Sequence, residues 1–283
     1  MDKKLFIEPK DLSINIKTQN NLKIIDATFY LPDSGLIAKD EYNKKHIHKA
    51  VFFDINNIAD PNNHLPHMIP SKELFSEMMS DLGLNNEDDI VIYDNSPFLS
   101  SARAWFLFRY FGYENISILH GGLKNWIKSG GEVTNMTTSI SKGNFVAKKE
   151  RKELVVSLDQ MINASKNVKS IILDARSYKR FTGEANEPRP GLSSGHIPNS
   201  KSLPSSDLIN KDGYLKSLNE LNSIFSKGNI SVNDDIVATC GSGVSACVIA
   251  IALFCMGKTD VTIYDGSWSE WASSGQKIVK GEE

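Results

Sequence analysis

The feature that most constrains the fold of this chain is an internal repeat. Six blocks of the first half recur in the same order in the second half. Their offset drifts only from 150 residues, between His46 and His196, to 145 residues, between Trp126 and Trp271. A module of this length written twice within 283 residues predicts two homologous domains, each large enough to bury a core of its own.

Each copy of the repeat alternates strand-like apolar runs with helical patterns. The order is strand, loop, short strand, helix, strand, helix, strand, helix, which predicts an α/β fold in which a parallel sheet carries helices on both faces. Residues 10–135 are predicted to form the N-terminal domain and residues 154–279 the C-terminal domain. The segment 136–153 is rich in Ser, Thr, Lys and Gly, so we predict an interdomain linker there.

The composition narrows the class of protein. The formal net charge of −2 is close to neutral, so no nucleic-acid partner is expected. The first residues lack the apolar core of a signal peptide, and no apolar run approaches the roughly 20 residues that span a bilayer. The three cysteines, Cys240, Cys247 and Cys255, fit neither a disulfide framework nor a CxxC metal site. We therefore expect a soluble cytoplasmic protein with no membrane partner, no metal and no cofactor.

A cysteine stands in the second copy where a parallel sheet would place a ligand, outside the carboxyl end of a strand. The apolar run Ile236–Ala238 predicts a buried strand, and Cys240 lies at its end. Gly241 and Gly243 then allow a tight loop before an apolar helix that starts near Ser245. Backbone N–H groups and the helix macrodipole in such a loop favour a thiolate, the nucleophilic form of cysteine. The alternative is a cysteine that only packs in the core, but such a residue does not need two neighbouring glycines.

The first copy carries a different residue at this position. Alignment of the two copies places Asp94 opposite Cys240, 146 residues earlier. A carboxylate can accept hydrogen bonds from a ring of N–H groups, but it cannot perform sulfur chemistry. We therefore expect the first domain to be catalytically silent and to contribute a wall of the active-site cleft. The alternative is that the two domains stack only for stability.

The tandem modules and the loop Cys240–Ala246, with the sequence CGSGVSA, resemble the two-domain rhodanese-type sulfurtransferases. Within that family the loop is most similar to the pattern C-G-S/T-G-V-T/S-A of 3-mercaptopyruvate sulfurtransferases. The resemblance covers about Leu12 to Gly275 and implies two tandem rhodanese-like domains. It also implies an enzyme that moves sulfur from 3-mercaptopyruvate to cyanide or to a thiol acceptor such as thioredoxin. The sulfur would pass through a cysteine persulfide, and pyruvate would be released.

The nearest alternative is a thiosulfate sulfurtransferase, which differs only in its sulfur donor. Thiosulfate-specific relatives typically carry basic residues directly after the cysteine, whereas this chain has Gly241 and Ser242. A cysteine-based phosphatase needs an arginine six places after its cysteine to bind phosphate, and that place is Ala246 here. A persulfide carrier without enzymatic activity is the third alternative, and the intact cysteine loop argues against it.

The resemblance also implies roles for individual residues. Cys240 would be the nucleophile, and a Ser-His-Asp relay proposed in the family would correspond to Ser242, His67 and Asp54. Two simpler alternatives stay open, namely that Asp54 caps a turn and that His67 is an ordinary polar loop residue. The remaining residues of the loop would bind the substrate; they are Gly241, Gly243, Val244 and Ser245.

Two arginines match the carboxylate-binding arginines of the family. They are Arg180 and Arg189, and their separation of nine residues also matches. A donor that carries a carboxylate and a ketone calls for planar cations of this kind. The alternative is that both are solvated loop arginines. A third arginine, Arg176, follows Asp174 closely and is expected to pair with acidic residues.

Overall fold

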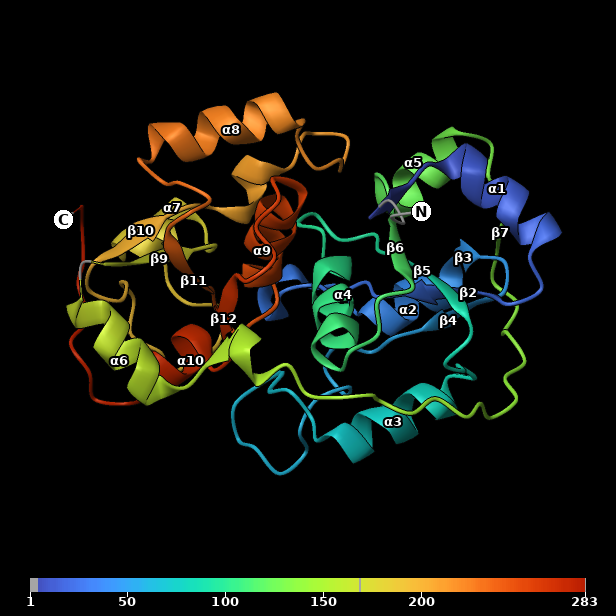
Figure 1. The fold of residues 1–283 in the computed structure, drawn as a ribbon, viewed down its shortest axis with the longest axis horizontal. Coiled ribbons are helices and arrows are strands. Elements are labelled where there is room, and N and C mark those ends of the chain that lie inside the picture. Colours follow the sequence, from blue (N-terminus) through green and yellow to red (C-terminus); the bar gives the residue numbers. More distant parts are fainter. Residues whose placement is uncertain (1–4, 168, 283) are drawn as a thin grey trace. The chain divides into compact units, whose positions relative to one another are not determined.

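The computed structural model describes residues 5–167 and 169–282, which form two compact units (Figure 1). Within this range, unit 1 holds residues 5–61, 69–151 and 211–214. Unit 2 holds residues 62–68, 152–210 and 215–282. Each unit is therefore built mainly from one half of the chain, with one short segment from the other half.

Unit 1 is a parallel sheet of five strands in the order β1-β6-β5-β2-β4. In chain order the strands are β1 (Phe6–Ile7), β2 (Leu22–Asp26), β4 (Ala50–Phe52), β5 (Asp89–Tyr93) and β6 (Ile116–Leu119). A small antiparallel pair is formed by β3 (His46–Ile47) and β7 (Val133–Thr134). The helices are α1 (Pro9–Thr18), α2 (Ala38–Lys44), α3 (Lys72–Asp81), α4 (Ser101–Tyr110) and α5 (Gly122–Lys128), with one 3₁₀ turn, η1 (Pro32–Ser34).

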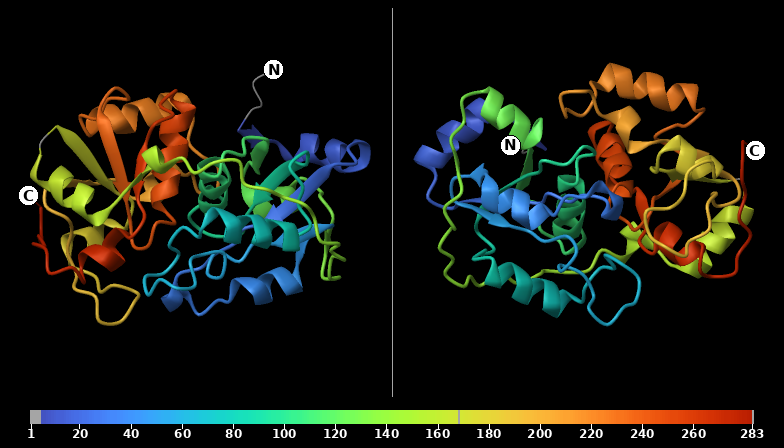
Figure 2. Two further views of the ribbon diagram at one scale, coloured as in Figure 1. Left: turned by 60° about the horizontal axis from the view of Figure 1, so that its bottom comes forward. Right: turned by 180° about the vertical axis from the view of Figure 1, so that it is seen from behind.

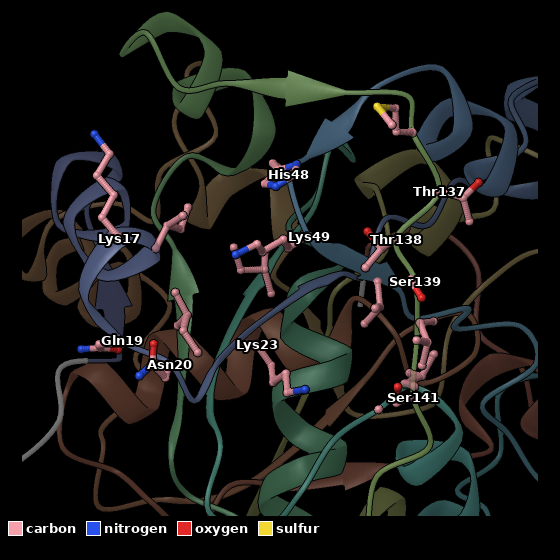
Figure 3. A pocket seen from close by; sticks show the side chains of 18 residues that line it. Lys17, Gln19, Asn20, Lys23, His48, Lys49, Thr137, Thr138, Ser139 and Ser141 are labelled. Atoms are coloured by element: carbon pink, nitrogen blue, oxygen red, sulfur yellow. The ribbon is translucent and has the colours of Figure 1, made fainter.

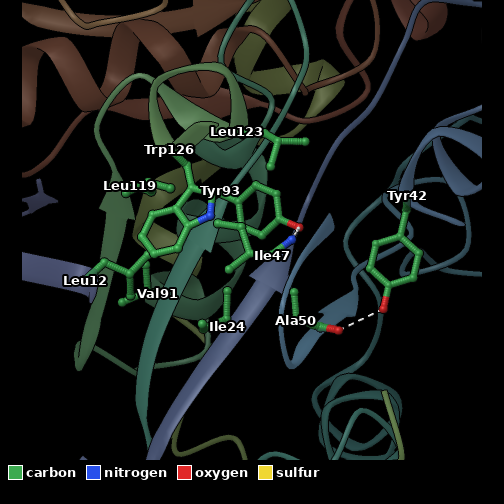
Figure 4. Close-up of a cluster of buried hydrophobic side chains, with 10 residues drawn as sticks. All are labelled: Leu12, Ile24, Tyr42, Ile47, Ala50, Val91, Tyr93, Leu119, Leu123 and Trp126. Atoms are coloured by element: carbon green, nitrogen blue, oxygen red, sulfur yellow. Dashed lines mark hydrogen bonds between the residues drawn. The ribbon is translucent and has the colours of Figure 1, made fainter. Parts of the chain in front are cut away.

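Helices cover both faces of the sheet in unit 1. On one face, side chains of α1, α2 and α5 pack against strand residues of β2 and β5 (Figure 4). The Tyr93 hydroxyl accepts a hydrogen bond from the Ile47 N–H within this cluster, at 3.1 Å. On the other face, Phe75 of α3 packs edge-on against Phe108 of α4, with ring centroids 5.4 Å apart. Each face thus has its own apolar layer, as expected for parallel strands that are buried on both sides.

Unit 2 repeats this architecture with strand order β10-β9-β11-β12-β8, all parallel. Its strands are β8 (Val155–Val156), β9 (Ser170–Asp174), β10 (Ser200–Ser202), β11 (Asp235–Thr239) and β12 (Thr262–Tyr264). Its helices are α6 (Leu158–Lys166), α7 (Tyr178–Thr182), α8 (Leu218–Lys227), α9 (Ala246–Cys255) and α10 (Ser267–Trp271), with the 3₁₀ turns η2 (Lys152–Leu154) and η3 (Ser205–Leu208). Matching strands hold matching places in the two sheets, so the predicted α/β fold with two copies of one module is confirmed.

Equivalent histidines make equivalent contacts in the two copies. The Nδ1 atom of His46 lies 2.7 Å from the carbonyl oxygen of Tyr42, and that of His196 lies 2.9 Å from the carbonyl oxygen of Phe181. Each imidazole also stacks on the ring of the same partner. Because both rings are buried and both Nδ1 atoms contact a carbonyl oxygen of their own unit, these histidines hold matching places in the two cores.

The segment predicted to be a linker packs along unit 1. We call residues 136–151 the strap; Figures 1 and 2 show it as an extended yellow-green segment. The Gly143 N–H donates to the Ser80 carbonyl at 2.8 Å, and Phe145 is buried against Phe75 and Phe108. The composition of the strap predicted a linker, but it did not indicate that Gly143 and Phe145 attach this segment to unit 1. The domain ranges 10–135 and 154–279 stay a prediction.

None of the helices in the described part of the chain combines the length and the apolar character needed to cross a membrane.

Asp26 is a buried carboxyl group of unit 1. Its counterpart in unit 2, Asp174, forms an ion pair with an arginine, whereas Asp26 has a threonine at the equivalent place. Asp26 ends β2, as Asp174 ends β9, and Asp174 is paired with Arg176. Unit 1 has Thr28 at the place of Arg176, and its N–H donates to Asp26 Oδ1 at 2.9 Å. Burial raises the pKa of Asp26 to about 6, although the hydrogen bonds from Thr28 oppose this shift. The native state therefore holds this proton more tightly than the unfolded chain does.

This difference predicts the pH dependence of an Asp26→Asn variant. Because the pKa is raised in the folded state, the wild type loses stability as the pH rises from about 4 to about 6. The asparagine variant lacks this loss, so its stability advantage should grow across that window to at most about 3 kcal/mol and then stay constant. Urea midpoints measured between pH 4.5 and 8 test this. An advantage that does not change with pH, or that also occurs in the exposed control Asp33→Asn, would contradict the assignment.

Candidate active site

The loop that begins with Cys240 joins β11 to α9 at the carboxyl end of the unit 2 sheet. Thr239 is the last residue of β11, and α9 begins at Ala246. Gly243 adopts a φ of +75°, a left-handed conformation that costs other residues free energy. Cys240 is buried, with 2 % of its surface exposed. The apolar helix α9 is buried along most of its length, which fixes the loop to the core.

Ser267 supports this loop from the turn that follows β12. Its Oγ accepts hydrogen bonds from the N–H groups of Cys240, at 3.3 Å, and Gly243, at 3.0 Å. The same hydroxyl donates to the Tyr264 carbonyl at 2.7 Å. Ser267 is fully buried and has a φ of +50°. The sequence analysis did not identify Ser267 as a functional residue. The repeat includes the segment around Ser267, but it does not indicate that this serine contacts the cysteine loop.

Replacement of Ser267 by alanine should disturb the cysteine loop directly. Two buried N–H groups would lose their acceptor, which typically costs about 1–3 kcal/mol for each group. We expect Ser267→Ala to lower the free energy of unfolding by about 2–4 kcal/mol. Ser273→Ala is a matched control. Ser273 is an exposed residue just after α10, and among the described residues its hydroxyl donates to the Ser269 carbonyl alone. Equal unfolding midpoints for the two variants would show that Ser267 does not support the loop.

The loop retains hydrogen-bond donors that no acceptor uses. Within the described residues, four N–H groups of the loop have no hydrogen-bond acceptor; they belong to Gly241, Ser242, Val244 and Ser245. The N–H of Gly243, by contrast, donates to Ser267. Free backbone N–H groups that lie close together before a helix form a favourable environment for an anion. Of the four loop residues expected to bind the substrate, Gly241, Val244 and Ser245 therefore offer a free donor, whereas the N–H of Gly243 is used by Ser267.

The equivalent loop of unit 1 is occupied by its own carboxylate. Asp94 follows β5 as Cys240 follows β11. It accepts hydrogen bonds from the Ser96 N–H and the Ser101 N–H, both at 3.0 Å, and from the Ser96 hydroxyl at 2.8 Å. Burial raises the pKa of Asp94, and these hydrogen bonds oppose the shift. The Asp94 carboxyl group thus accepts the N–H donors of Ser96 and Ser101 in its own loop.

His67 lies against Ser242, although the two residues are far apart in the sequence. The Nδ1 atom of His67 and the Oγ atom of Ser242 are 2.9 Å apart. Both residues are buried and both belong to unit 2, because residues 62–68 pack with that unit. His67 has a φ of +62°, an unusual conformation for a residue with a side chain. The structure therefore brings together two of the three residues of the expected relay.

Asp54 makes the contacts of a turn residue in unit 1. Its Oδ1 accepts a hydrogen bond from the Asn56 N–H at 3.0 Å, and its Oδ2 accepts one from Asn57 Nδ2 at 2.8 Å. Its carbonyl oxygen also accepts the N–H groups of Asn57 and Ile58. These are the contacts expected if Asp54 caps a turn, the alternative that the sequence left open.

Three arginines of unit 2 differ in how their charges are balanced. Arg176 pairs with Asp174 and with Glu187, at 2.6 and 2.8 Å, which confirms the expectation that it binds acidic residues. Arg180 forms two hydrogen bonds to Glu187, from Nη2 at 2.5 Å and from Nε at 3.2 Å. Arg189 has no hydrogen bond or ion pair to any residue that the structure describes. Arg189 is therefore the cation of this group that no ion pair compensates, although the negative charges of Cys240 and Glu187 still favour its charged form.

Both candidate substrate-binding arginines lie next to the cysteine loop. A Cβ atom added to Gly241 would lie 3.0 Å from Arg180 Nη2 and 4.0 Å from Arg189 Nη1. Burial lowers the pKa of Arg189, the negative charge of Cys240 opposes this shift, and the positive charge of Arg180 adds to it. The glycine at position 241 thus leaves room for Arg180 against the loop backbone.

The other two cysteines are packed in α9. The Cys247 Sγ donates to the Gly243 carbonyl at 3.2 Å and is fully buried. Burial raises the pKa of the Cys255 thiol to about 11. A thiol with such a pKa is a poor nucleophile at neutral pH. The geometry of unit 2 therefore singles out Cys240.

A large cavity in unit 1 contains none of the candidate residues. It has a volume of about 730 Å³ and is lined by the end of α1, the start of β2, the β3–β4 turn and the strap (Figure 3). Lys17, Lys23 and Lys49 contribute its positive charges. The cavity lies at the amino end of β2, whereas ligands of open parallel sheets bind at the carboxyl ends. The Cys240 loop, at the carboxyl end of β11, therefore stays the candidate active site.

Comparison with known proteins agrees with this geometry. The sequence model of the Rhodanese-like domain matches residues 8–129 and again residues 155–274. The chain belongs to the rhodanese family. A thiosulfate/3-mercaptopyruvate sulfurtransferase of Arabidopsis thaliana, described as mitochondrial, is 40% identical over 283 residues, which cover 93% of this chain and 75% of the relative. A 3-mercaptopyruvate sulfurtransferase of Escherichia coli K12 is 38% identical over 253 residues, 89% of each chain.

The rhodanese fold is also found in a solved relative. The crystal structure of a 3-mercaptopyruvate sulfotransferase from Escherichia coli superimposes with a TM-score of 0.85 and 35% identity. The match covers 95% of this chain and 100% of that chain. The family and the tandem arrangement of its domains, both expected from the sequence, are thus confirmed.

Proposed function

We propose that this rhodanese transfers sulfur from 3-mercaptopyruvate to an acceptor through a persulfide on Cys240. The observation that carries the proposal is the combination of a cysteine, a loop with free N–H donors and an uncompensated arginine beside it. The names of the two curated relatives described above agree with this donor. No second function is needed to explain these groups.

The first half-reaction follows from these groups. The Cys240 thiolate attacks the sulfur of the donor, so a sulfur–sulfur bond forms and the carbon–sulfur bond of the donor breaks. The electron pair of that bond remains on the carbon fragment as the enolate of pyruvate, which takes up a proton to give pyruvate. The transferred sulfur loses its own thiol proton when the persulfide becomes anionic, so the net result is the movement of one proton from that sulfur to the pyruvate methyl group. The N–H groups of Gly241, Ser242, Val244 and Ser245 stabilise the anionic persulfide without needing a charged side chain.

The proton for the enolate is assigned to Ser242. Its hydroxyl is hydrogen-bonded to His67, which can replace the proton after transfer. Asp54 stays a predicted third member of the relay that rests on the family resemblance alone, and its local contacts are those of a turn cap. We also propose that the domain with Asp94 is catalytically silent, because its loop donors already bind a carboxylate.

The second half-reaction returns the enzyme to its starting state. A thiol of the acceptor, deprotonated to the thiolate, attacks the outer sulfur of the persulfide, and Cys240 leaves as a thiolate. We propose a protein dithiol such as thioredoxin as the acceptor, with cyanide as a substitute in the assay. The cytoplasm is the proposed location, since it keeps such thiols reduced.

The donor is tested by steady-state kinetics with the full chain. We expect kcat/KM for 3-mercaptopyruvate to exceed that for thiosulfate, with pyruvate formed in proportion to the sulfur transferred. A larger value for thiosulfate would replace the proposal by the alternative, a thiosulfate sulfurtransferase.

A further inference from the structure

The charges around the cysteine loop leave a single positive charge for the donor. Two carboxylates balance two of the three guanidinium groups near the loop. Asp174 pairs with Arg176, and Glu187 pairs with both Arg176 and Arg180. Arg189 then remains without an ion-pair partner among the described residues. The site thus presents a net charge of about +1 before the cysteine is counted.

We propose that Glu187 is a specificity-determining residue that restricts the site to donors with one negative charge. This inference rests on the proposed function. Glu187 binds Arg176 with Oε1 and Arg180 with both oxygens, and its side chain is only 2 % exposed. It therefore neutralises an arginine that lies directly against the loop backbone at Gly241.

The two alternative donors differ by one charge. 3-Mercaptopyruvate with a neutral thiol carries only its carboxylate charge, whereas thiosulfate is a dianion. With the Cys240 thiolate counted, the site is about neutral, so thiosulfate brings one more uncompensated negative charge than 3-mercaptopyruvate does. Because the Arg180 side chain is 13 % exposed and that of Glu187 is nearly inaccessible, water screens this excess charge poorly. The negative charge of Glu187 therefore weakens the binding of thiosulfate more than that of 3-mercaptopyruvate.

Glu187→Gln removes the restricting charge with little change of shape. The amide oxygen can still accept hydrogen bonds from the arginines, while the net charge of the site rises by one. Both donors should bind more tightly, and the dianion should gain more. We expect the ratio of kcat/KM for thiosulfate to kcat/KM for 3-mercaptopyruvate to rise about tenfold, and to rise less at high ionic strength.

The matched control is Glu184→Gln, three residues earlier in the same loop. Glu184 is exposed and accepts a hydrogen bond from the Thr182 hydroxyl, with no arginine partner among the residues described. This control should leave the donor ratio unchanged. An unchanged or lower ratio in a folded Glu187→Gln variant, or an equal rise in the control, would overturn the proposal.

A second measurement does not depend on the folding of the variant. Pyruvate and sulfate, a monoanion and a dianion, are titrated calorimetrically into the wild-type protein. The charge balance predicts weaker binding of sulfate than of pyruvate, and equal or tighter binding of sulfate would contradict it. If the wild type does not turn over 3-mercaptopyruvate, the proposed function fails. The same titrations with a folded Glu187→Gln variant still test the role of Glu187, because sulfate should then gain more affinity than pyruvate, and an equal gain for both anions would contradict that role.

Discussion

Replacement of Cys240 by serine is expected to lower sulfur transfer by a factor on the order of 10³ or more while the fold stays intact. The hydroxyl of serine is about the size of the thiol, so the buried loop should keep its contacts with Ser267. Serine, however, cannot form a persulfide, and the other two thiols lie within α9 rather than in the loop. Activity with 3-mercaptopyruvate and the thermal midpoint are measured on the same preparation.

The matched controls are Cys247→Ser and Cys255→Ser. The first thiol donates to the Gly243 carbonyl in the core, and burial raises the pKa of the second to about 11. Cys255→Ser should keep full activity. Cys247→Ser can lose stability, since it places a hydroxyl in a fully buried site, but its folded fraction should transfer sulfur. Wild-type activity in Cys240→Ser, or loss of activity only in the controls, would contradict the assignment.

Arg189→Met is expected to lower kcat/KM for 3-mercaptopyruvate by about tenfold to a hundredfold without a loss of stability. The guanidinium of Arg189 makes no ion pair with the described residues, so its donors are free for the substrate carboxylate. Burial and the charge of Arg180 both disfavour its charged form. Removal of this charge should therefore leave the thermal midpoint unchanged or raise it slightly.

Arg180→Met is the informative comparison, because it removes a charge that has a partner. Glu187 would be left buried with Arg176 as its remaining partner. We expect a loss of about 1–3 kcal/mol in the free energy of unfolding together with the loss in kcat/KM. Denaturant unfolding and steady-state kinetics separate the two variants. If Arg189→Met proves the more destabilising of the two, or keeps wild-type kcat/KM, then Arg189 is a structural residue.

The sequence predicted the parts of this structure that depend on pattern. The repeat implied two units with one topology, and their strand orders agree. The glycines beside Cys240 implied a tight loop before a helix, and the loop has that form. Arg176 was expected to pair with acidic residues and does so. These features are local in the chain, or repeat within it, so residue types and spacings are sufficient to reveal them.

Other features depend on contacts that spacing cannot reveal. Ser267 reaches the loop only because β11 and β12 are neighbours in the sheet. Residues 62–68 pack with unit 2, and this places His67 beside Ser242. The strap was predicted to be part of an interdomain linker because it is rich in Ser, Thr, Lys and Gly, and its composition does not reveal that Phe145 anchors it to unit 1. The choice of Glu187 as the partner of Arg180 likewise follows from the folded loop.

The measurement that tests the central claim most directly is mass spectrometry after treatment with one equivalent of 3-mercaptopyruvate. The whole protein should gain the mass of one sulfur atom as one pyruvate is released. Because a tryptic peptide that contains Cys240 also contains Cys247 and Cys255, fragmentation of that peptide in the mass spectrometer should place the sulfur on Cys240, and a thiol acceptor should remove it. Sulfur found on Cys255, or pyruvate released with no sulfur on the protein, would contradict a persulfide mechanism at Cys240.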